Sequence, residues 1–273
     1  MESRILFKSM SSGSCGNCYY LGLESPEGKH KGLIIDAGVS LRRLKRTLVE
    51  NGISLSDISC LAITHDHLDH IRSLGSFCKK LDIDIWATAQ LHKALSHHFI
   101  TGQEYETASK KALQPGQWHS ILDGEALIRY FEVPHDATQT VGFAIQLAGH
   151  NYVHITDCGA LTEEALDLCR QAHTVVLESN YDTRMLIEGP YTEELKRRIL
   201  NGNGHMSNSD CARAIKNFAH EGLKNLFLCH LSENNNTPQL AYLSARQALE
   251  EAGMSGVRLQ ALPRTHCSEL IYL

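Results

Sequence analysis

Residues 64 to 70 read Thr-His-Asp-His-Leu-Asp-His and follow directly on the apolar run 58–63, Ile-Ser-Cys-Leu-Ala-Ile. Three histidines and two aspartates therefore fall within six residues at the end of a predicted strand. His65 and His67 are two residues apart and share a face in extended backbone, while the last two residues of the stretch open a predicted helix. Such a loop can turn several ring nitrogens and a carboxylate oxygen toward one point, as a metal centre requires. A solvated polar loop is the alternative, and it accounts less well for this density of metal-binding side chains.

The composition is that of an ordinary folded protein. Of the 273 residues, 42% are hydrophobic and 21% are charged, and the net charge is −5. This negative net charge disfavours electrostatic binding of nucleic acid over a large part of the surface, although it is compatible with local basic patches. The N-terminal residues lack the apolar segment of a secretory signal, and no run approaches the roughly 18 apolar residues of a membrane span. We therefore expect a soluble, cytoplasmic protein. Its nine cysteines, odd in number and without framework spacing, favour free thiols over disulfides.

Short β-type apolar runs and helical patterns divide the chain. The predicted strands cover residues 5–7, 18–23, 32–35, 58–64, 83–87, 127–133, 141–147, 152–156, 174–177, 226–229, 257–262 and 270–273. The predicted helices cover residues 40–50, 69–81, 89–98, 162–171, 192–200, 209–220 and 238–252. The block of strands between 118 and 156 fits two packed sheets with helices outside better than a doubly wound sheet. No linker or repeat marks a boundary, so we expect a single domain over residues 1–273.

The His-x-His-x-Asp-His pattern of residues 65–70 resembles that of the metallo-β-lactamase superfamily. The resemblance implies an α/β (α+β) fold, the αββα sandwich, in which two packed mixed sheets carry helices on their outer faces. It also implies a dinuclear metal site at one rim of the sandwich. Further acidic and histidine motifs are then expected after other strands.

Four such motifs occur in the expected order. Asp36 follows the strand-like run 33–35, and the resemblance implies that it orients a ligand histidine from behind; an aspartate that caps the following turn is the alternative. His135, Asp157 and His230 each follow a predicted strand. Each is a weak signal alone, whereas their order and their strand-end placement together agree with the family.

The resemblance thereby implies a full ligand set for two divalent metal ions. The ligands expected on one ion are His65, His67 and His135, and those expected on the other are Asp69, His70 and His230. Asp157 would bridge the two, and a bridged pair suits phosphodiester or thioester hydrolysis better than lactam hydrolysis. We expect zinc or manganese, and this ligand set also accepts iron or nickel.

A second cluster, Gly204-His205-Met206-Ser207-Asn208, opens the predicted helix 209–220. A helix N-terminus offers free backbone N–H groups to an anion, so Ser207 and Asn208 are predicted phosphate contacts. His205 is a predicted catalytic residue that protonates a leaving oxygen or hydrogen-bonds the phosphate. An ordinary helix cap with a chance histidine is the alternative.

Residues 11–18, Ser-Ser-Gly-Ser-Cys-Gly-Asn-Cys, allow two interpretations. A Cys-x-x-Cys zinc site would need a second thiol pair, and a thiol–disulfide enzyme would need a thioredoxin-like βαβ context; the sequence offers neither. We therefore interpret the stretch as a phosphate-facing wall of the hydrolase site. The predicted phosphate contacts in it are Ser11, Ser12, Ser14 and Asn17, and Cys18 is predicted to begin a strand.

Together, these motifs resemble the YycJ (or WalJ) group of small metallo-hydrolases over nearly the whole chain. The stretches that carry the resemblance are residues 11–18, 64–70, 133–137, 156–159, 178–182, 204–208 and 229–236. This resemblance implies a 5′→3′ exonuclease with DNA as its partner. For such a reaction we expect Asp69, beside the nucleophile, to accept its proton. The alternatives are an RNA-directed nuclease, a thioesterase or lactonase on the same fold, and a module that binds nucleic-acid ends without cutting them.

Overall fold

The computed structural model describes residues 3–200 and 204–273, and their strands form two seven-stranded sheets. The first sheet has the order β14 (Ile271–Tyr272), β1 (Arg4–Ser11), β2 (Cys18–Glu24), β3 (His30–Ile35), β4 (Ile58–Ala62), β5 (Asp84–Thr88) and β6 (Ser109–Leu113). The second has the order β13 (Arg258–Ala261), β12 (Asn225–Cys229), β11 (Thr174–Glu178), β10 (His150–Ile155), β9 (Val141–Leu147), β8 (Ala126–Glu132) and β7 (His119–Ile121). Both sheets are mixed, because antiparallel and parallel pairs occur in each.

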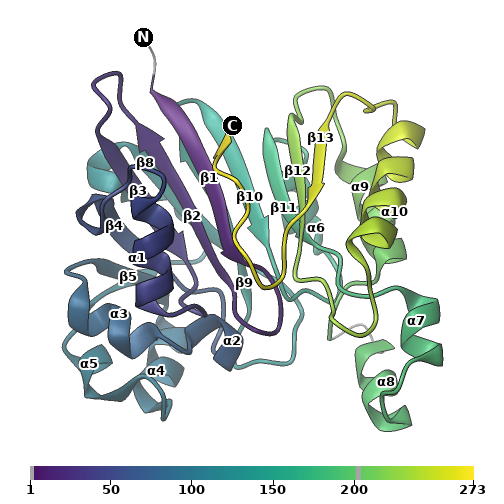
Figure 1. Cartoon of the computed structure of the whole chain (residues 1–273), viewed down its shortest axis with the longest axis horizontal. Coiled ribbons are helices and arrows are strands. Elements are labelled where there is room, and N and C mark those ends of the chain that lie inside the picture. The colour runs from purple at the N-terminus through teal and green to yellow at the C-terminus, as the bar shows by residue number, and fades with distance from the viewer. Residues whose placement is uncertain (1–2, 201–203) are drawn as a thin grey trace.

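Helices lie on the outer faces of the pair of sheets (Figure 1). Those in the first half of the chain are α1 (Leu41–Val49), α2 (Leu68–Ile71), α3 (Leu74–Lys80), α4 (Ala89–His97) and α5 (Gly102–Glu106). Those in the second half are α6 (Glu163–Cys169), α7 (Thr183–Glu188), α8 (Glu193–Leu200), α9 (Asn208–Phe218) and α10 (Pro238–Glu251). Side-chain oxygens accept backbone N–H groups at several helix starts, as Thr162 does for α6 and Ser207 for α9. Within the described ranges, no helix is long and apolar enough to cross a membrane.

Three apolar clusters hold these layers together. The middle cluster lies between the sheets, where the rings of Phe7 on β1 and Phe227 on β12 stack with centroids 5.0 Å apart. A second cluster packs α1, α3 and α4 on the first sheet, and a third packs α6, α9 and α10 on the other. The prediction of an αββα sandwich is therefore confirmed.

The parallel strands position the functional site. In the first sheet β3 and β4 run parallel, and in the second β10, β11 and β12 do so. Because parallel strands end at the same edge of a sheet, the residues that follow them are brought together. The motifs at residues 36, 64–70, 157 and 230 follow these strands, and residue 178 is the last residue of β11.

Several details differ from the sequence-based expectation, since β6, β7, α5 and α7 were not among the predicted elements. Strand β6, Ser-Lys-Lys-Ala-Leu, was not expected, because an edge strand with exposed lysines lacks an apolar alternation. The single helix expected over 69–81 is instead α2 followed by α3. The reason is tertiary: the Asp69 carbonyl accepts the N–H of Asn17 at 2.7 Å, and the N–H of Ser73 donates to the Ala37 carbonyl at 2.9 Å.

Candidate metal centre

The residues that follow β3, β10 and β12 leave their strands in an unusual backbone conformation. Asp36, Asp157 and His230 have φ angles of 61°, 47° and 52°. For residues with a Cβ this left-handed region is unfavourable by roughly 1–2 kcal/mol. Such conformations cluster at functional sites, where the surrounding structure maintains them. Here they turn the chain sharply at the edge where the histidine motif lies.

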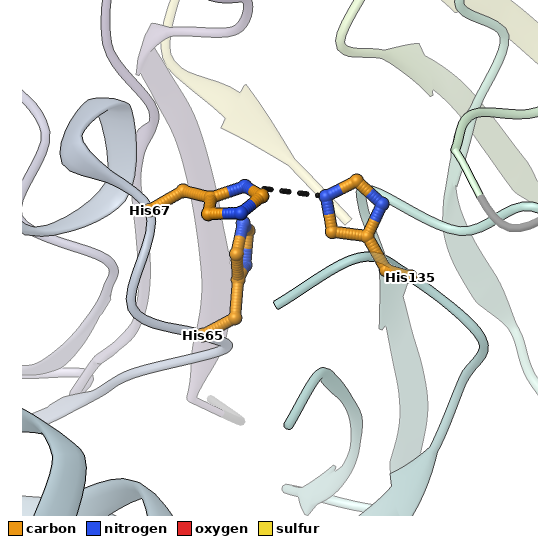
Figure 2. Close-up of side chains that lie close together, drawn as sticks. All are labelled: His65, His67 and His135. Carbon is orange, nitrogen blue, oxygen red and sulfur yellow. Dashed lines mark hydrogen bonds between the residues drawn. The ribbon is translucent and has the colours of Figure 1, made fainter. Parts of the chain in front are cut away.

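Three histidine rings form the first part of the site. His65 and His67 come from the loop after β4, His135 comes from the loop after β8, and Figure 2 shows their rings turned toward one another. One ligand atom from each ring lies within 4.8 Å of the others. His135 Nδ1 lies 2.5 Å from the Gly204 carbonyl. When Nδ1 donates its hydrogen to this carbonyl, Nε2 of the same ring is free to act as a metal ligand.

Asp69, His70 and His230 form the second part, with ligand atoms again within 4.8 Å of one another. Asp69 Oδ2 lies 3.4 Å from His230 Nε2 and 3.5 Å from His70 Nε2. Burial raises the pKa of Asp69, but the charges and hydrogen bonds of these two rings outweigh it and lower that pKa. Asp69 is therefore an ionised carboxylate at neutral pH.

Asp157 lies between the two parts. Its Oδ2 is 3.1 Å from His70 Nε2, and its Oδ1 is 3.7 Å from His135 Nε2. Although burial alone would raise the pKa of Asp157, the charges of His230 and His70 hold it well below its usual value. One ionised carboxylate thus reaches both groups of histidines, as a bridging ligand would.

The donor set fits divalent metal ions. Imidazole nitrogens and carboxylate oxygens converge in a buried place, which is the ligand chemistry that zinc, manganese, iron and nickel accept. Among the described residues, the buried Nε2 of His65 has no hydrogen-bond partner. Burial, reinforced by the charge of His70, holds the pKa of His65 well below its usual value. That ring is therefore neutral, with a lone pair available to a metal ion.

Asp36 lies behind the metal-facing side chains. It is fully buried and accepts hydrogen bonds from the backbone N–H and the hydroxyl of Thr64, each at 2.8 Å. Its Oδ2 also lies 2.7 Å from Nδ1 of His70. The carboxylate therefore orients the His70 ring so that Nε2 faces Asp157.

Glu178, at the end of β11, is a site residue that was not predicted. Its buried carboxylate accepts the N–H groups of Cys158 at 2.8 Å and Met206 at 3.1 Å through Oε2. Its Oε1 lies 2.8 Å from Nδ1 of His205 and 3.0 Å from Nδ1 of His230. The sequence showed only a polar residue after a strand; the signal that could have revealed it is that this strand lies between β10 and β12, whose ends both carry site residues.

His205 reaches the site from the loop before α9. Its side chain is 24% exposed, so it meets both Glu178 and solvent. Burial lowers the pKa of His205, but the Glu178 carboxylate outweighs burial and raises it. With Nδ1 donating to Glu178, Nε2 is left to face a substrate.

The 11–18 loop contacts the site mainly from within the protein. Ser12 and Asn17 are fully buried: the Ser12 hydroxyl accepts the N–H of His230 at 2.9 Å, and Asn17 Nδ2 donates to Asp69 Oδ2 at 3.1 Å. The buried Ser11 hydroxyl donates to the Arg264 carbonyl at 2.6 Å. The structure thus places these three side chains among protein partners, and their contact with phosphate stays a prediction. Ser14, the fourth predicted contact, lines a cavity together with His67 and His205.

Ser207 and Asn208 are likewise turned inward. The Ser207 hydroxyl caps α9 by accepting the N–H of Asp210 at 3.0 Å. Asn208 is buried, and its Oδ1 accepts the hydroxyl of Ser179 at 2.7 Å. Both side chains are thus engaged in local hydrogen bonds at the start of α9, and a phosphate contact through them stays a prediction.

The two cysteines of the 11–18 loop, Cys15 and Cys18, do not form a disulfide with each other. Cys15 is exposed, while Cys18 is buried and begins β2, as predicted. All nine cysteines are free thiols. The loop is therefore a support of the site and carries no disulfide.

Comparisons with known proteins agree with this geometry. Residues 32–230 match the family model of the beta-lactamase superfamily domain. The exodeoxyribonuclease YycJ of Bacillus anthracis is 33% identical over 90% of this chain and 90% of that protein. The exodeoxyribonuclease WalJ of Streptococcus pneumoniae serotype 2 is 29% identical over 91% of this chain and 89% of its own length.

Among solved structures, zinc-bound PqqB of Methylobacterium extorquens has a TM-score of 0.70 and 15% identity, over 97% of this chain and 99% of that one. A likeness at this identity concerns the fold alone. The family match covers most of the chain, and the expected resemblance to the YycJ and WalJ proteins is confirmed. The chain belongs to the metallo-β-lactamase superfamily and is a metal-dependent hydrolase.

Proposed function

We propose that the protein is a phosphodiester hydrolase with two divalent metal ions that removes nucleotides from the 5′ end of DNA. The observation that carries the proposal is the position of Asp157, whose one carboxylate lies beside both groups of histidines. That arrangement favours a bridged pair of ions over a single ion. The names of the YycJ and WalJ relatives favour DNA as the substrate.

The ligand assignment follows the two groups of side chains. The ligands proposed for one ion are His65, His67 and His135, and those for the other are Asp69, His70 and His230, with Asp157 as the bridge. When bound, such a pair of ions activates water and neutralises charge that develops on the phosphate.

The protein's own side chains supply the proton transfers. Asp69 is held ionised by its histidine neighbours, so it can accept a proton at its carboxylate during attack. His205 is held by Glu178 at Nδ1 and can donate a proton from Nε2 to the leaving oxygen. Asp36 and Glu178 orient rings from behind, which keeps both groups in place.

The test is a set of hydrolysis assays on metal-loaded protein. The substrates are 5′-labelled DNA and RNA, each single- and double-stranded, together with a thioester. The proposal predicts release of the labelled nucleotide from DNA; thioester turnover without phosphodiester cleavage would refute it, and faster RNA cleavage would change the substrate to RNA.

An Asp69→Ala variant, purified in parallel, is the control for contamination. We expect it to lose at least about 100-fold in kcat, because it removes both a proposed ligand and the proton acceptor. Equal activity of the two preparations would show that the cleavage comes from another protein.

A further inference from the structure

A cavity of about 250 Å³ opens beside the metal centre. Its lining includes His67 and His205 of the candidate metal centre together with residues of helix α8. Sites that enclose a whole drug-sized ligand usually measure about 300–1,000 Å³. This cavity therefore suits one group of nucleotide size and leaves no room for a length of polymer.

One wall of the cavity is apolar. Leu195 and Ile199 are four residues apart and share one face of α8, and Tyr191, in the bend just before the helix, lines the same cavity. None of the eight residues of α8 is buried, and these three side chains are only half-buried. They thus line the cavity instead of packing into an apolar core.

The cavity lining also contains polar side chains and one cationic side chain. Asn180, Ser232 and Asn235 present amide and hydroxyl groups that can both donate and accept hydrogen bonds. Arg198 of α8 lies at the rim, paired with Asp136 and 65% exposed. A ligand that fits has a flat, partly apolar body with a polar edge and an attached anion.

We propose that this cavity holds the terminal nucleoside that hydrolysis releases, with its base against the ring of Tyr191 and its phosphate between Arg198 and the metal centre. The proposal rests on the proposed function. Among the described residues, the buried Oδ1 of Asn235 has no hydrogen-bond partner, and an acyl chain would leave it unpaired, which disfavours a thioester in the same place. Stacking on an aromatic ring is the sequence-tolerant way in which proteins hold single-stranded bases.

The test compares two DNA substrates that differ only in whether the 5′-terminal nucleotide carries a base or an abasic sugar. The wild-type protein should cleave the abasic end with a kcat/KM at least about fivefold lower, mainly through KM, since one stacked base contributes at least that factor. Tyr191→Ala should show the same loss on the ordinary end and no further loss on the abasic end. Tyr191→Phe, which keeps the ring, should restore the preference for the base.

Glu194→Ala is the matched control, because Glu194 is an exposed residue of the same helix that does not line the cavity. It should behave as wild type; a loss equal to that of Tyr191→Ala would overturn the proposal. Equal kcat/KM for the two ends in the wild-type protein would also overturn it while leaving the phosphodiesterase intact. If the wild-type protein cleaved neither substrate, the proposed function itself would be refuted. Failure of the cavity proposal and failure of the proposed function therefore give different results.

Discussion

At the scale of single residues, buried acids and imidazoles stabilise each other in the site. Burial would raise the pKa of the carboxyl groups of Asp157 and Glu178, yet neighbouring histidines lower both. For His230 the two effects are reversed. Burial alone would lower the pKa of this ring, but the neighbouring carboxylates of Asp157, Asp69 and Glu178 have the larger effect and raise that pKa to about 10. A metal ion must displace the proton that these carboxylates hold on the ring.

Glu178→Gln tests the role of the unpredicted acid. The amide keeps the size of the side chain and an oxygen for the N–H groups of Cys158 and Met206, but it removes the charge that orients His205. We expect kcat to fall about 10–100-fold, as for other groups that orient ligands from behind. The measurement is kcat and KM against pH, with Glu188→Gln on the exposed end of α7 as control. Unchanged kcat in Glu178→Gln would contradict the assignment.

His150, the first residue of β10, lies outside the proposed ligand set and is expected to make the stability depend on pH. Burial, reinforced by the charge of His173, lowers the pKa of His150 to about 4 in the folded protein, against about 6.5 in the unfolded chain. Between these values the unfolded chain binds more protons, so the free energy of unfolding falls as pH falls from about 6.5 to about 4. Because the ring is only half-buried, we expect about 1–2 kcal/mol from this group.

Urea unfolding at pH 7 and pH 4.5 checks this expectation. His150→Gln keeps a polar group near the hydroxyl of Thr174, which lies 2.9 Å from His150 Nε2, and cannot take up the proton. The variant should lose less stability on acidification than the wild-type protein. An identical loss in both proteins would show that His150 does not contribute.

At the scale of elements, backbone hydrogen bonds near Gly38 connect three loops from separate parts of the first sheet. The N–H of Gly38 donates to the Asn17 carbonyl at 2.9 Å, and the N–H of Asn17 donates to the Asp69 carbonyl at 2.7 Å. A Cβ on Gly38 would lie 1.8 Å from the Asp69 carbonyl oxygen and 2.5 Å from Asn17 N. The 11–18 loop thus serves as a brace for the histidine motif.

Gly38→Ala should therefore displace the loop that carries Asp69 and His70. Backbone atoms cannot give way as side chains do, so we expect a loss of about 2–4 kcal/mol in unfolding free energy and a large loss of activity. Gly256→Ala is the matched control, since a Cβ there meets nothing within 4 Å. Equal melting temperatures for the two variants would contradict this account of the brace.

The elements also show what could be predicted from sequence. The helix over 192–200 and the strand before His65 follow from periodicity and composition, because these patterns are local. The break between α2 and α3 could not be predicted, because it depends on hydrogen bonds to Asn17 and Ala37, which are distant in sequence. For the same reason the inward orientation of Ser12 was not foreseen: a Ser-rich loop has the same composition whether it faces a ligand or a neighbouring loop.

At the scale of the whole molecule, two sheets bring strand ends from residues 36 to 230 to one edge. The seven predicted ligands lie there because each follows a strand or belongs to the 64–70 motif, both of which are visible in the sequence. Glu178 is likewise at a strand end, as the last residue of β11, but sequence does not reveal that β11 lies between β10 and β12. The cavity beside α8 was also unpredictable, because an amphipathic helix does not disclose what its apolar stripe faces.

Metal removal should weaken the whole fold, because the site joins both sheets. An ion that binds only the folded state adds about 2.7 kcal/mol when its concentration is 100 times Kd. In a protein of this size that corresponds to a rise in Tm of roughly 5–10 °C over the chelator-treated protein. Calorimetry with and without metal measures this rise in Tm. His135→Ala, which removes a proposed ligand, should show a smaller rise, and the control His97→Ala, at an exposed position, should show the same rise as the wild-type protein. The same Tm with and without metal in the wild-type protein would contradict a metal site that joins the sheets.

The most direct test of the central claim is a titration of chelator-treated protein with zinc or manganese while the release of the terminal nucleotide from 5′-labelled DNA is followed. The bridging position of Asp157 predicts that activity rises from near zero and reaches its plateau at two ions per chain. Full cleavage by the metal-free protein, or a plateau at one ion per chain, would contradict a two-metal phosphodiesterase.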